Sequence, residues 1–235
     1  MTSTRLPGKV LLPIAGRPML SYQIERLRRV RSHDVLVVAT TVNATDDPIV
    51  EFCAAERVRC TRGSEQDVLR RYRDAATAVG ANVVVRVTSD CPLIDPDVVD
   101  GVIRVFKAAQ GSLDYVSNTL EPSYPCGMAV EVMSTVALSE ADAEATSPVD
   151  REHVTPFLYR NPHRYHLQSV RLDADLSANR WTVDTPEDLE LIRLILESLY
   201  PRCSDFRMND VLALLAQHPQ WRTLNQHVRQ KTLGE

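Results

Sequence analysis

The chain has 235 residues, of which 44% are hydrophobic and 25% are charged, and its formal net charge at pH 7 is -4. This length fits one large domain, and the mildly acidic total argues against a protein that binds nucleic acid through a broad basic surface. The sequence contains no apolar run of membrane-spanning length and no apolar signal segment, so we expect a cytoplasmic protein without a membrane partner. The five cysteines form no C-x-x-C pair, which predicts reduced thiols.

Short apolar runs alternate with amphipathic helical patterns in the first half of the chain. The valine-rich run 33–41 is typical of a buried strand, and the helix expected at 95–111 has Asp95 as its N-cap and Pro96 in its first turn. This alternation predicts an α/β domain with a mostly parallel sheet flanked by helices. The helices expected here cover 18–30, 46–58, 65–80 and 95–111, and the strands cover 33–41 and 82–90.

The pattern changes after about residue 112, where the predicted segments become shorter. We interpret 1–235 as a single domain with an inserted subregion at about 112–175 and a helical C-terminus at 185–235. The strands expected in this half cover 114–118, 128–134, 165–172 and 180–184, and the helices cover 150–162, 185–200 and 208–219.

The run STRLPGK near the N-terminus has the chemistry of a phosphate-binding loop. It combines two cations, two hydroxyl donors and a glycine that permits a tight turn. It does not match the P-loop pattern, which would require glycine at position 3 and serine or threonine at position 10. From spacing alone, a surface loop with two basic residues is an equally good interpretation. The residues concerned are Ser3, Thr4, Arg5, Gly8 and Lys9.

Two aspartates follow predicted strands and are not needed as helix caps. Asp90 lies five positions before the cap Asp95, and Asp184 precedes Thr185, which forms a capping box with Asp188. Each aspartate alone is more simply a solvated loop residue. Two of them at the carboxyl ends of strands, together with a cationic loop, predict a Mg²⁺ site that also contacts substrate phosphates.

Several segments in order along the chain resemble the sugar-nucleotide cytidylyltransferases, the group of the CMP-KDO and CMP-sialate synthetases. The resemblance is greatest to the SpsF-like branch of spore coat polysaccharide biosynthesis. It implies a Rossmann-like, GT-A-type nucleotidyltransferase fold. It also implies Mg²⁺-dependent transfer of CMP from CTP to an acidic or modified sugar, with release of pyrophosphate, for surface polysaccharide synthesis. The segments are STRLPGKVLLPIAGRPML, GSEQDVLRRY, RVTSDCPLIDPDVVD, YPCGMAVEV, DREHVTPFLY and WTVDTPEDLELI.

The resemblance also assigns roles to individual residues. Members of the family hold Mg²⁺ with one aspartate from each of two motifs, here Asp90 and Asp184, and Arg5 and Lys9 complete the expected catalytic set. The subregion 112–175 would bind the sugar and support a homodimer. Further nucleotide contacts are expected from Ser64, Asp67, Arg71 and Ser89, and sugar contacts from Tyr124, Gly127, Glu131, Arg151 and His153.

Some of these residues also have a structural interpretation. Ser64 and Asp67 form a possible capping box for the helix that follows, and a lone histidine such as His153 is more often structural than catalytic. Arg151 could pair either with Glu131 or with a sugar carboxylate.

The acceptor sugar and the general base stay open. Ala129 occupies a position where many relatives are expected to have aspartate, so the sequence does not fix the sugar. Val154, Phe157 and Tyr159 are expected to pack their helix, with a dimer interface as an alternative.

The resemblance places a strand directly ahead of the phosphate loop. Met1 falls within that segment, so we expect this chain to start about ten residues late and to lack the first strand. Two alternative functions follow: nucleotidyl transfer from another NTP, and nucleotide binding without turnover.

Overall fold

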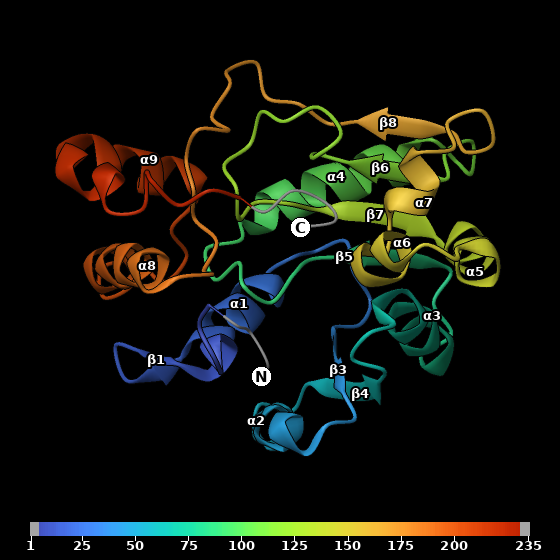
Figure 1. The fold of residues 1–235 in the computed structure, drawn as a ribbon. Helices are drawn as coiled ribbons and strands as arrows, with labels where there is room; N and C mark the ends of the chain where they lie inside the picture. Colours follow the sequence, from blue (N-terminus) through green and yellow to red (C-terminus); the bar gives the residue numbers. More distant parts are fainter. Residues whose placement is uncertain (1–4, 231–235) are drawn as a thin grey trace.

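A computed structural model describes residues 5–230 of the chain (Figure 1). The helices are α1 (Met19–Leu27), α2 (Asp47–Ala55), α3 (Val68–Ala78), α4 (Pro96–Ala108), α5 (Thr135–Glu144), α6 (Pro148–His153), α7 (Pro156–Tyr159), α8 (Pro186–Leu199) and α9 (Met208–Gln217), with 3-10 turns η1 (Lys9–Leu11), η2 (Ala44–Asp46) and η3 (Pro219–Thr223). The strands are β1 (Pro13–Ile14), β2 (Arg17–Pro18), β3 (Val37–Thr41), β4 (Arg59–Gly63), β5 (Val83–Arg86), β6 (Tyr115–Ser117), β7 (Glu131–Ser134) and β8 (Leu167–Ser169).

The strands of the described region form three separate hydrogen-bonded groups. β1 and β2 make a small hairpin, β3 and β4 pair in parallel, and the third group has the order β5-β7-β6-β8. In that group β7 runs antiparallel to both β5 and β6, while β6 and β8 are parallel. The α/β prediction is confirmed, but the pairing is mixed rather than mostly parallel, because β7 lies between β5 and β6 and runs opposite to both.

Two of the elements expected after residue 112 differ from the prediction. The helix expected at 150–162 is divided into α6 and α7, because Val154 has a positive φ of 75°, which lies outside helical geometry. The segment 180–184 is not assigned as a strand, and its first residue makes an isolated parallel bridge with Cys126.

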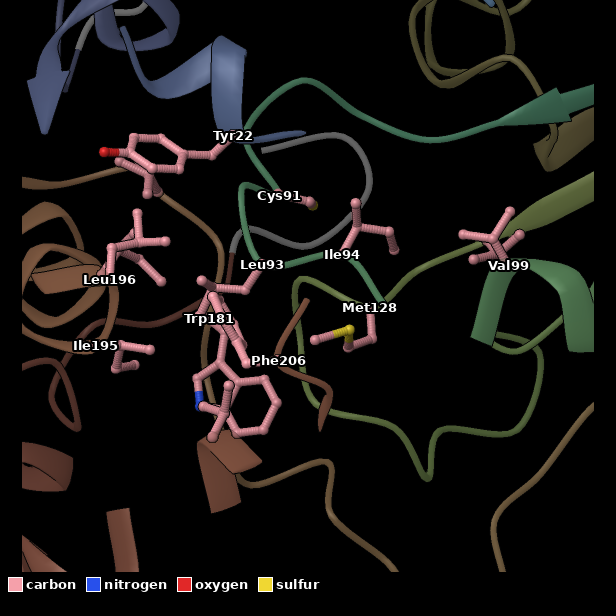
Figure 2. Packing of buried hydrophobic residues seen from close by; sticks show 14 of the residues in the cluster. Tyr22, Cys91, Leu93, Ile94, Val99, Met128, Trp181, Ile195, Leu196 and Phe206 are labelled. Carbon is pink, nitrogen blue, oxygen red and sulfur yellow. The ribbon is translucent and has the colours of Figure 1, made fainter. Parts of the chain in front are cut away.

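The main hydrophobic cluster joins residues from both ends of the described chain. Figure 2 shows Trp181 beside Leu93, Met128 and Phe206, and Trp181 is only 1% exposed. α8 and α9 lie side by side and contribute Ile195 among other apolar residues to this cluster (Figure 1). The loops that carry the two predicted aspartates are therefore anchored in the same core.

Trp221, Leu224 and Val228 form an apolar stripe near the C-terminus whose simplest interpretation is packing in the core or against a partner. Trp221 and Leu224 pack against the main cluster, in agreement with the core alternative. Val154 is fully buried, and Phe157 and Tyr159 pack against a second cluster under α5 to α7. The homodimer stays a prediction, and Val154 is not available to it because its side chain is buried within the chain.

A cavity of about 340 Å³ lies between β3 and β5. Its lining includes apolar residues of both strands, with α1 and α3 also contributing. The first strand predicted from the sequence would precede the described residues, so it stays a prediction. Within residues 5–230, no helix is both long and apolar enough to cross a membrane.

Candidate active site

Three segments that are far apart in the sequence meet at the ammonium group of Lys9. Lys9 Nζ lies 3.0 Å from Asp90 Oδ2 and 2.8 Å from Asp184 Oδ1. The three side chains are 15%, 23% and 13% exposed, respectively, so they are sheltered but reachable from solvent. The pair of aspartates predicted from the sequence is therefore assembled around a single point, and the cation predicted for the phosphate loop occupies it.

The phosphate loop is shaped by a glycine and a 3-10 turn. Gly8 has a left-handed φ of 69°, which places Lys9 at the first position of η1. The backbone N–H of Leu11 donates to the carbonyl of Gly8 at 3.0 Å and closes the turn. The tight turn predicted at Gly8 is confirmed, and it directs Lys9 towards the two carboxylates.

Asp90 is held by the residues around it. Thr88 Oγ1 donates to Asp90 Oδ1 at 2.6 Å, and Gln23 of α1 donates to the Thr88 carbonyl at 2.6 Å. The backbone N–H of Val183 donates to the Asp90 carbonyl at 2.9 Å, which ties the two aspartate loops together. Cys91 points into the core from this loop (Figure 2), so the polar and apolar neighbours of Asp90 fix its position together.

Asp184 lies at the end of an alternating segment. Trp181 and Val183 are buried in the core, while Asp184 extends towards the loop cations. Its Oδ2 atom lies 3.2 Å from Arg5 Nη2 and 2.8 Å from Arg180 Nη2. Each oxygen of this carboxylate is thus paired with a different set of cations.

The charges of the cluster favour one another. Burial alone lowers the pKa of Lys9, but attraction to Asp90 and Asp184 outweighs burial and raises it above the ordinary lysine value. Burial alone raises the pKa of Asp184, but Lys9, Arg180 and Arg5 outweigh it and lower the pKa. The arrangement therefore maintains a charged lysine and an ionised carboxylate, as phosphate chemistry requires.

The residues predicted on the nucleotide side fall into two groups. Ser3 and Thr4 lie outside the described residues. Asp67 rather than Ser64 is the N-cap of α3 and accepts from the backbone of Arg70, because the helix begins three residues later than the capping box required.

The remaining predicted nucleotide residues lie close to that helix start or to the aspartate loop. Ser64 Oγ accepts from the Asp67 backbone at 3.1 Å, and Arg71 Nη1 donates to the Ser64 carbonyl at 2.6 Å. Burial lowers the pKa of Arg71. Ser89 is exposed next to Asp90 and lines the cavity between β3 and β5. Nucleotide contact by these residues stays a prediction.

The residues predicted on the sugar side already have internal partners. Glu131 is 6% exposed and accepts hydrogen bonds from Tyr115 at 2.7 Å and Thr155 at 2.5 Å, and it also pairs with Arg86. The possible pairing of Arg151 with Glu131 is wrong, because Arg86 takes that place.

Arg151 instead bridges two other acidic side chains. It donates to both oxygens of Asp67, at 2.9 and 2.5 Å, and to Asp142 Oδ1 at 2.7 Å. This guanidinium joins α6 to the start of α3 and to α5. A residue that only bound a sugar carboxylate would not need these two internal partners.

The other predicted sugar residues are placed by packing. Tyr124 is partly buried against the main cluster, and burial raises its pKa. Gly127 has a φ of 105°, and a Cβ there would lie 2.6 Å from the Trp181 backbone carbon, so a close approach of two segments requires this glycine. His153 is the last residue of α6 and is half-buried.

Most of the chain matches a known protein family. The family model described as Cytidylyltransferase matches residues 1–217. The chain is a member of the cytidylyltransferase family. It is 31% identical to the spore coat polysaccharide biosynthesis protein SpsF of Bacillus subtilis, over 93% of this chain and 92% of that protein.

Two further relatives extend the comparison. A solved cytidylyltransferase from Leptospira borgpetersenii superposes with a TM-score of 0.91 at 30% identity, over 99% of this chain and 95% of that one. A 3-deoxy-manno-octulosonate cytidylyltransferase of Anaeromyxobacter dehalogenans is 27% identical over 83% of this chain and 93% of that protein. The nucleotidyltransferase fold and enzyme class predicted from the sequence are therefore confirmed.

Sequence reasoning missed several residues that shape the site of this cytidylyltransferase. Arg180 and Thr88 were both interpreted only as strand residues, whereas each contacts a predicted aspartate. Asp188 was interpreted as a helix cap alone. A signal was present for Arg180, since a lone cation in an apolar segment tends to have a charged partner.

The donor set of this cytidylyltransferase fits a hard divalent cation. Asp90 and Asp184 approach one point closely enough for a single ammonium group to contact both. Mg²⁺ in nucleotide enzymes is commonly held by one or two carboxylates together with substrate phosphates. Within the described part of the chain, no group of three or more His, Cys, Asp and Glu side chains is arranged as a metal cage.

Proposed function

We propose that this enzyme transfers CMP from CTP to an acidic or modified sugar and releases pyrophosphate, in a Mg²⁺-dependent reaction of surface polysaccharide synthesis. The observation that supports this most directly is the convergence of Lys9, Asp90 and Asp184 at one point. The similarity to SpsF and to an octulosonate cytidylyltransferase supports the nucleotide and the class of sugar. We place the enzyme in the cytoplasm, the location expected from the sequence.

In the proposed reaction a sugar hydroxyl attacks the α-phosphate of CTP and pyrophosphate leaves in line. Asp90 and Asp184 would hold Mg²⁺, which when bound supplies charge neutralisation at the phosphate oxygens and favours ionisation of the hydroxyl. Lys9 and Arg5 would neutralise the charge that develops on the departing pyrophosphate. The protein acts through position and charge, and no covalent intermediate with the protein is required.

In this reaction Lys9 has two alternative binding partners, the pair of carboxylates and the phosphates of CTP. In the structure its ammonium group binds the two carboxylates, and with CTP bound we expect it to turn to the phosphates. The side chain is long and flexible, which suits such an exchange. Arg5 contacts Asp184 from the same loop and would follow the same path.

The experiment is a screen for CTP-dependent pyrophosphate release over eight- and nine-carbon acidic sugars, with and without Mg²⁺. Asp184→Asn should reduce turnover by about 10² to 10³-fold with little change in melting temperature, because it removes a charge that acts on the transition state. Near-normal turnover would remove Asp184 from the site. Thermal-shift measurements with each NTP decide the nucleotide, and stabilisation by UTP or GTP alone would contradict the assignment of CTP.

A further inference from the structure

The carboxylate of Asp188 is bonded far beyond what a helix cap requires. As a cap it accepts from the backbone N–H of Thr185, which completes the predicted capping box of α8. It is also 0% exposed and accepts from Arg180 Nε at 2.9 Å, from Arg180 Nη2 at 3.0 Å and from the Asp184 backbone N–H at 3.0 Å. These three donors come from the segment that carries Asp184.

Arg180 connects this buried carboxylate to the site. Its Nη2 atom donates to Asp184 Oδ2 at 2.8 Å as well as to Asp188 Oδ2 at 3.0 Å. The rigid guanidinium fork can hold two carboxylates in a fixed relation, which a lysine cannot do. Because Oδ2 of Asp184 is engaged on this side, Oδ1 faces Lys9 and Asp90.

The C-terminal segment completes the arrangement. Asn225, which is 3% exposed, follows η3 and donates to Asp188 Oδ1 at 2.8 Å and to the Arg180 carbonyl at 3.0 Å. Both contacts use the same amide nitrogen, so its two hydrogens are directed at the residues that support Asp184. Gln230 also accepts from Arg180 Nη1.

We infer that Arg180 is a positioning residue that fixes the orientation of the Asp184 carboxylate, and that Asn225 of the C-terminal segment holds it there through Asp188. The inference rests on the proposed function, in which Asp184 binds the cation and phosphates. The contacts of Asn225 connect the C-terminal segment to the site.

The test replaces Arg180 by lysine, which keeps the positive charge and removes the forked guanidinium group. Arg180→Lys should lower kcat by about 10 to 100-fold with the KM for CTP nearly unchanged, as loss of a residue behind a metal ligand typically does. Mn²⁺ binding to the nucleotide-free protein, followed by electron paramagnetic resonance, should weaken by a similar factor. Arg193→Lys is the matched control, because Arg193 lies in α8 and pairs with Glu190 and Glu197 at the surface.

A double-mutant cycle separates positioning from a general structural role. In the Asp184→Asn background, Arg180→Lys should have little further effect, since the group through which it acts is already changed. The same loss in both backgrounds, or wild-type kcat and Mn²⁺ affinity in Arg180→Lys, would overturn the inference.

Asn225→Ala provides a second variant if Arg180→Lys does not fold. It should lower kcat and Mn²⁺ affinity in the same direction by a smaller factor, and unchanged values would overturn the part assigned to the C-terminal segment. Failure of the proposed function is distinguishable, because the wild-type protein would then release no pyrophosphate with any sugar. The Mn²⁺ measurement would still report whether Arg180 acts through Asp184.

Discussion

Replacement of Lys9 by methionine tests how the ammonium group and a divalent cation share the two carboxylates. Lys9 Nζ contacts both Asp90 and Asp184, at 3.0 and 2.8 Å. A divalent cation that binds both carboxylates must displace this ammonium group. Methionine has similar length and no charge, so Lys9→Met removes the competitor and leaves the carboxylates in place.

The size of the effect follows from the distances. A pair of unit charges 3.0 Å apart attracts with about 1.4 kcal/mol in water and about 5.5 kcal/mol at an effective dielectric constant of about 20. The water-like limit for two contacts is already about 3 kcal/mol, and each ~1.4 kcal/mol changes an affinity about tenfold. We therefore expect Lys9→Met to bind Mn²⁺ roughly 100-fold more tightly in the absence of nucleotide.

The same variant should lose activity. Without Lys9 the triphosphate loses a cation, so the KM for CTP should rise and turnover should fall by about 10²-fold or more. Stability should fall by about 2 kcal/mol in the absence of divalent cations and recover when Mg²⁺ is added, because two facing carboxylates then lack their shared partner.

The assay is a Mn²⁺ titration of nucleotide-free protein by electron paramagnetic resonance, with chemical unfolding measured in parallel. Lys107→Met is the matched control, since Lys107 bonds the Ser32 carbonyl at the surface. An unchanged or weaker Mn²⁺ affinity in Lys9→Met would refute the reasoning, because it would show that the ammonium group does not compete for the site.

Two further predictions concern stability. Arg26 is 2% exposed and donates to the carbonyls of Ile94 and Phe206, so Arg26→Met should lower the free energy of unfolding by about 2 to 4 kcal/mol in urea titrations, since both carbonyls lose a charged donor. Burial alone raises the pKa of Asp100, but hydrogen bonds from Ser32 and Arg31 outweigh burial and lower the pKa. The contribution of Asp100 to stability is then full above its unfolded-state pKa of about 3.9 and is lost as the pH falls through the lower folded-state value, so Asp100→Asn should flatten the acid limb of the stability curve.

Each of these has a neighbouring control. Arg28→Met changes an exposed arginine that follows the same helix, and an equal loss there would contradict the role given to burial of Arg26. Asp97→Asn removes a more exposed carboxylate from α4, and the same flattening in both variants would count against Asp100.

A group of basic residues at and just after the end of α1 shows where local patterns mislead. Its members are Arg26, Arg28, Arg29 and Arg31. Position in the last turn of a helix favours the interpretation that its arginines complement the helix dipole in solvent. Arg26 instead lies against the Phe206 ring, 4.2 Å from its centroid, and burial lowers its pKa to about 10. The sequence near Arg26 carries no sign of this, because Phe206 lies 180 positions further along the chain.

Short elements with little hydrophobic pattern could also not be predicted from the sequence. β4 reads RCTRG, which has no continuous apolar face to predict a strand, and among the described strands it pairs only with β3. Segment 180–184 has a strand-like alternation, yet its neighbours supply an isolated bridge rather than a ladder. Strand assignment depends on a partner, and the partner is chosen by the fold.

The sequence by itself determined the features that depend on nearby residues and residue types. The cap at Asp95, the capping box at Thr185, the turn at Gly8 and the choice of Lys9 as a phosphate-loop cation all follow from residues a few positions apart. Motif order along the chain likewise sufficed for the family and the fold.

Only the tertiary structure decided which charges meet. Lys9 lies 81 positions from Asp90 and 175 from Asp184, and the support of Asp184 by Arg180 depends on Asn225 in the C-terminal segment. Arg86, not Arg151, pairs with Glu131 for the same reason. The pairing energy of a charge depends on distance and burial, and both are set by how distant segments pack, which no local pattern in the sequence records.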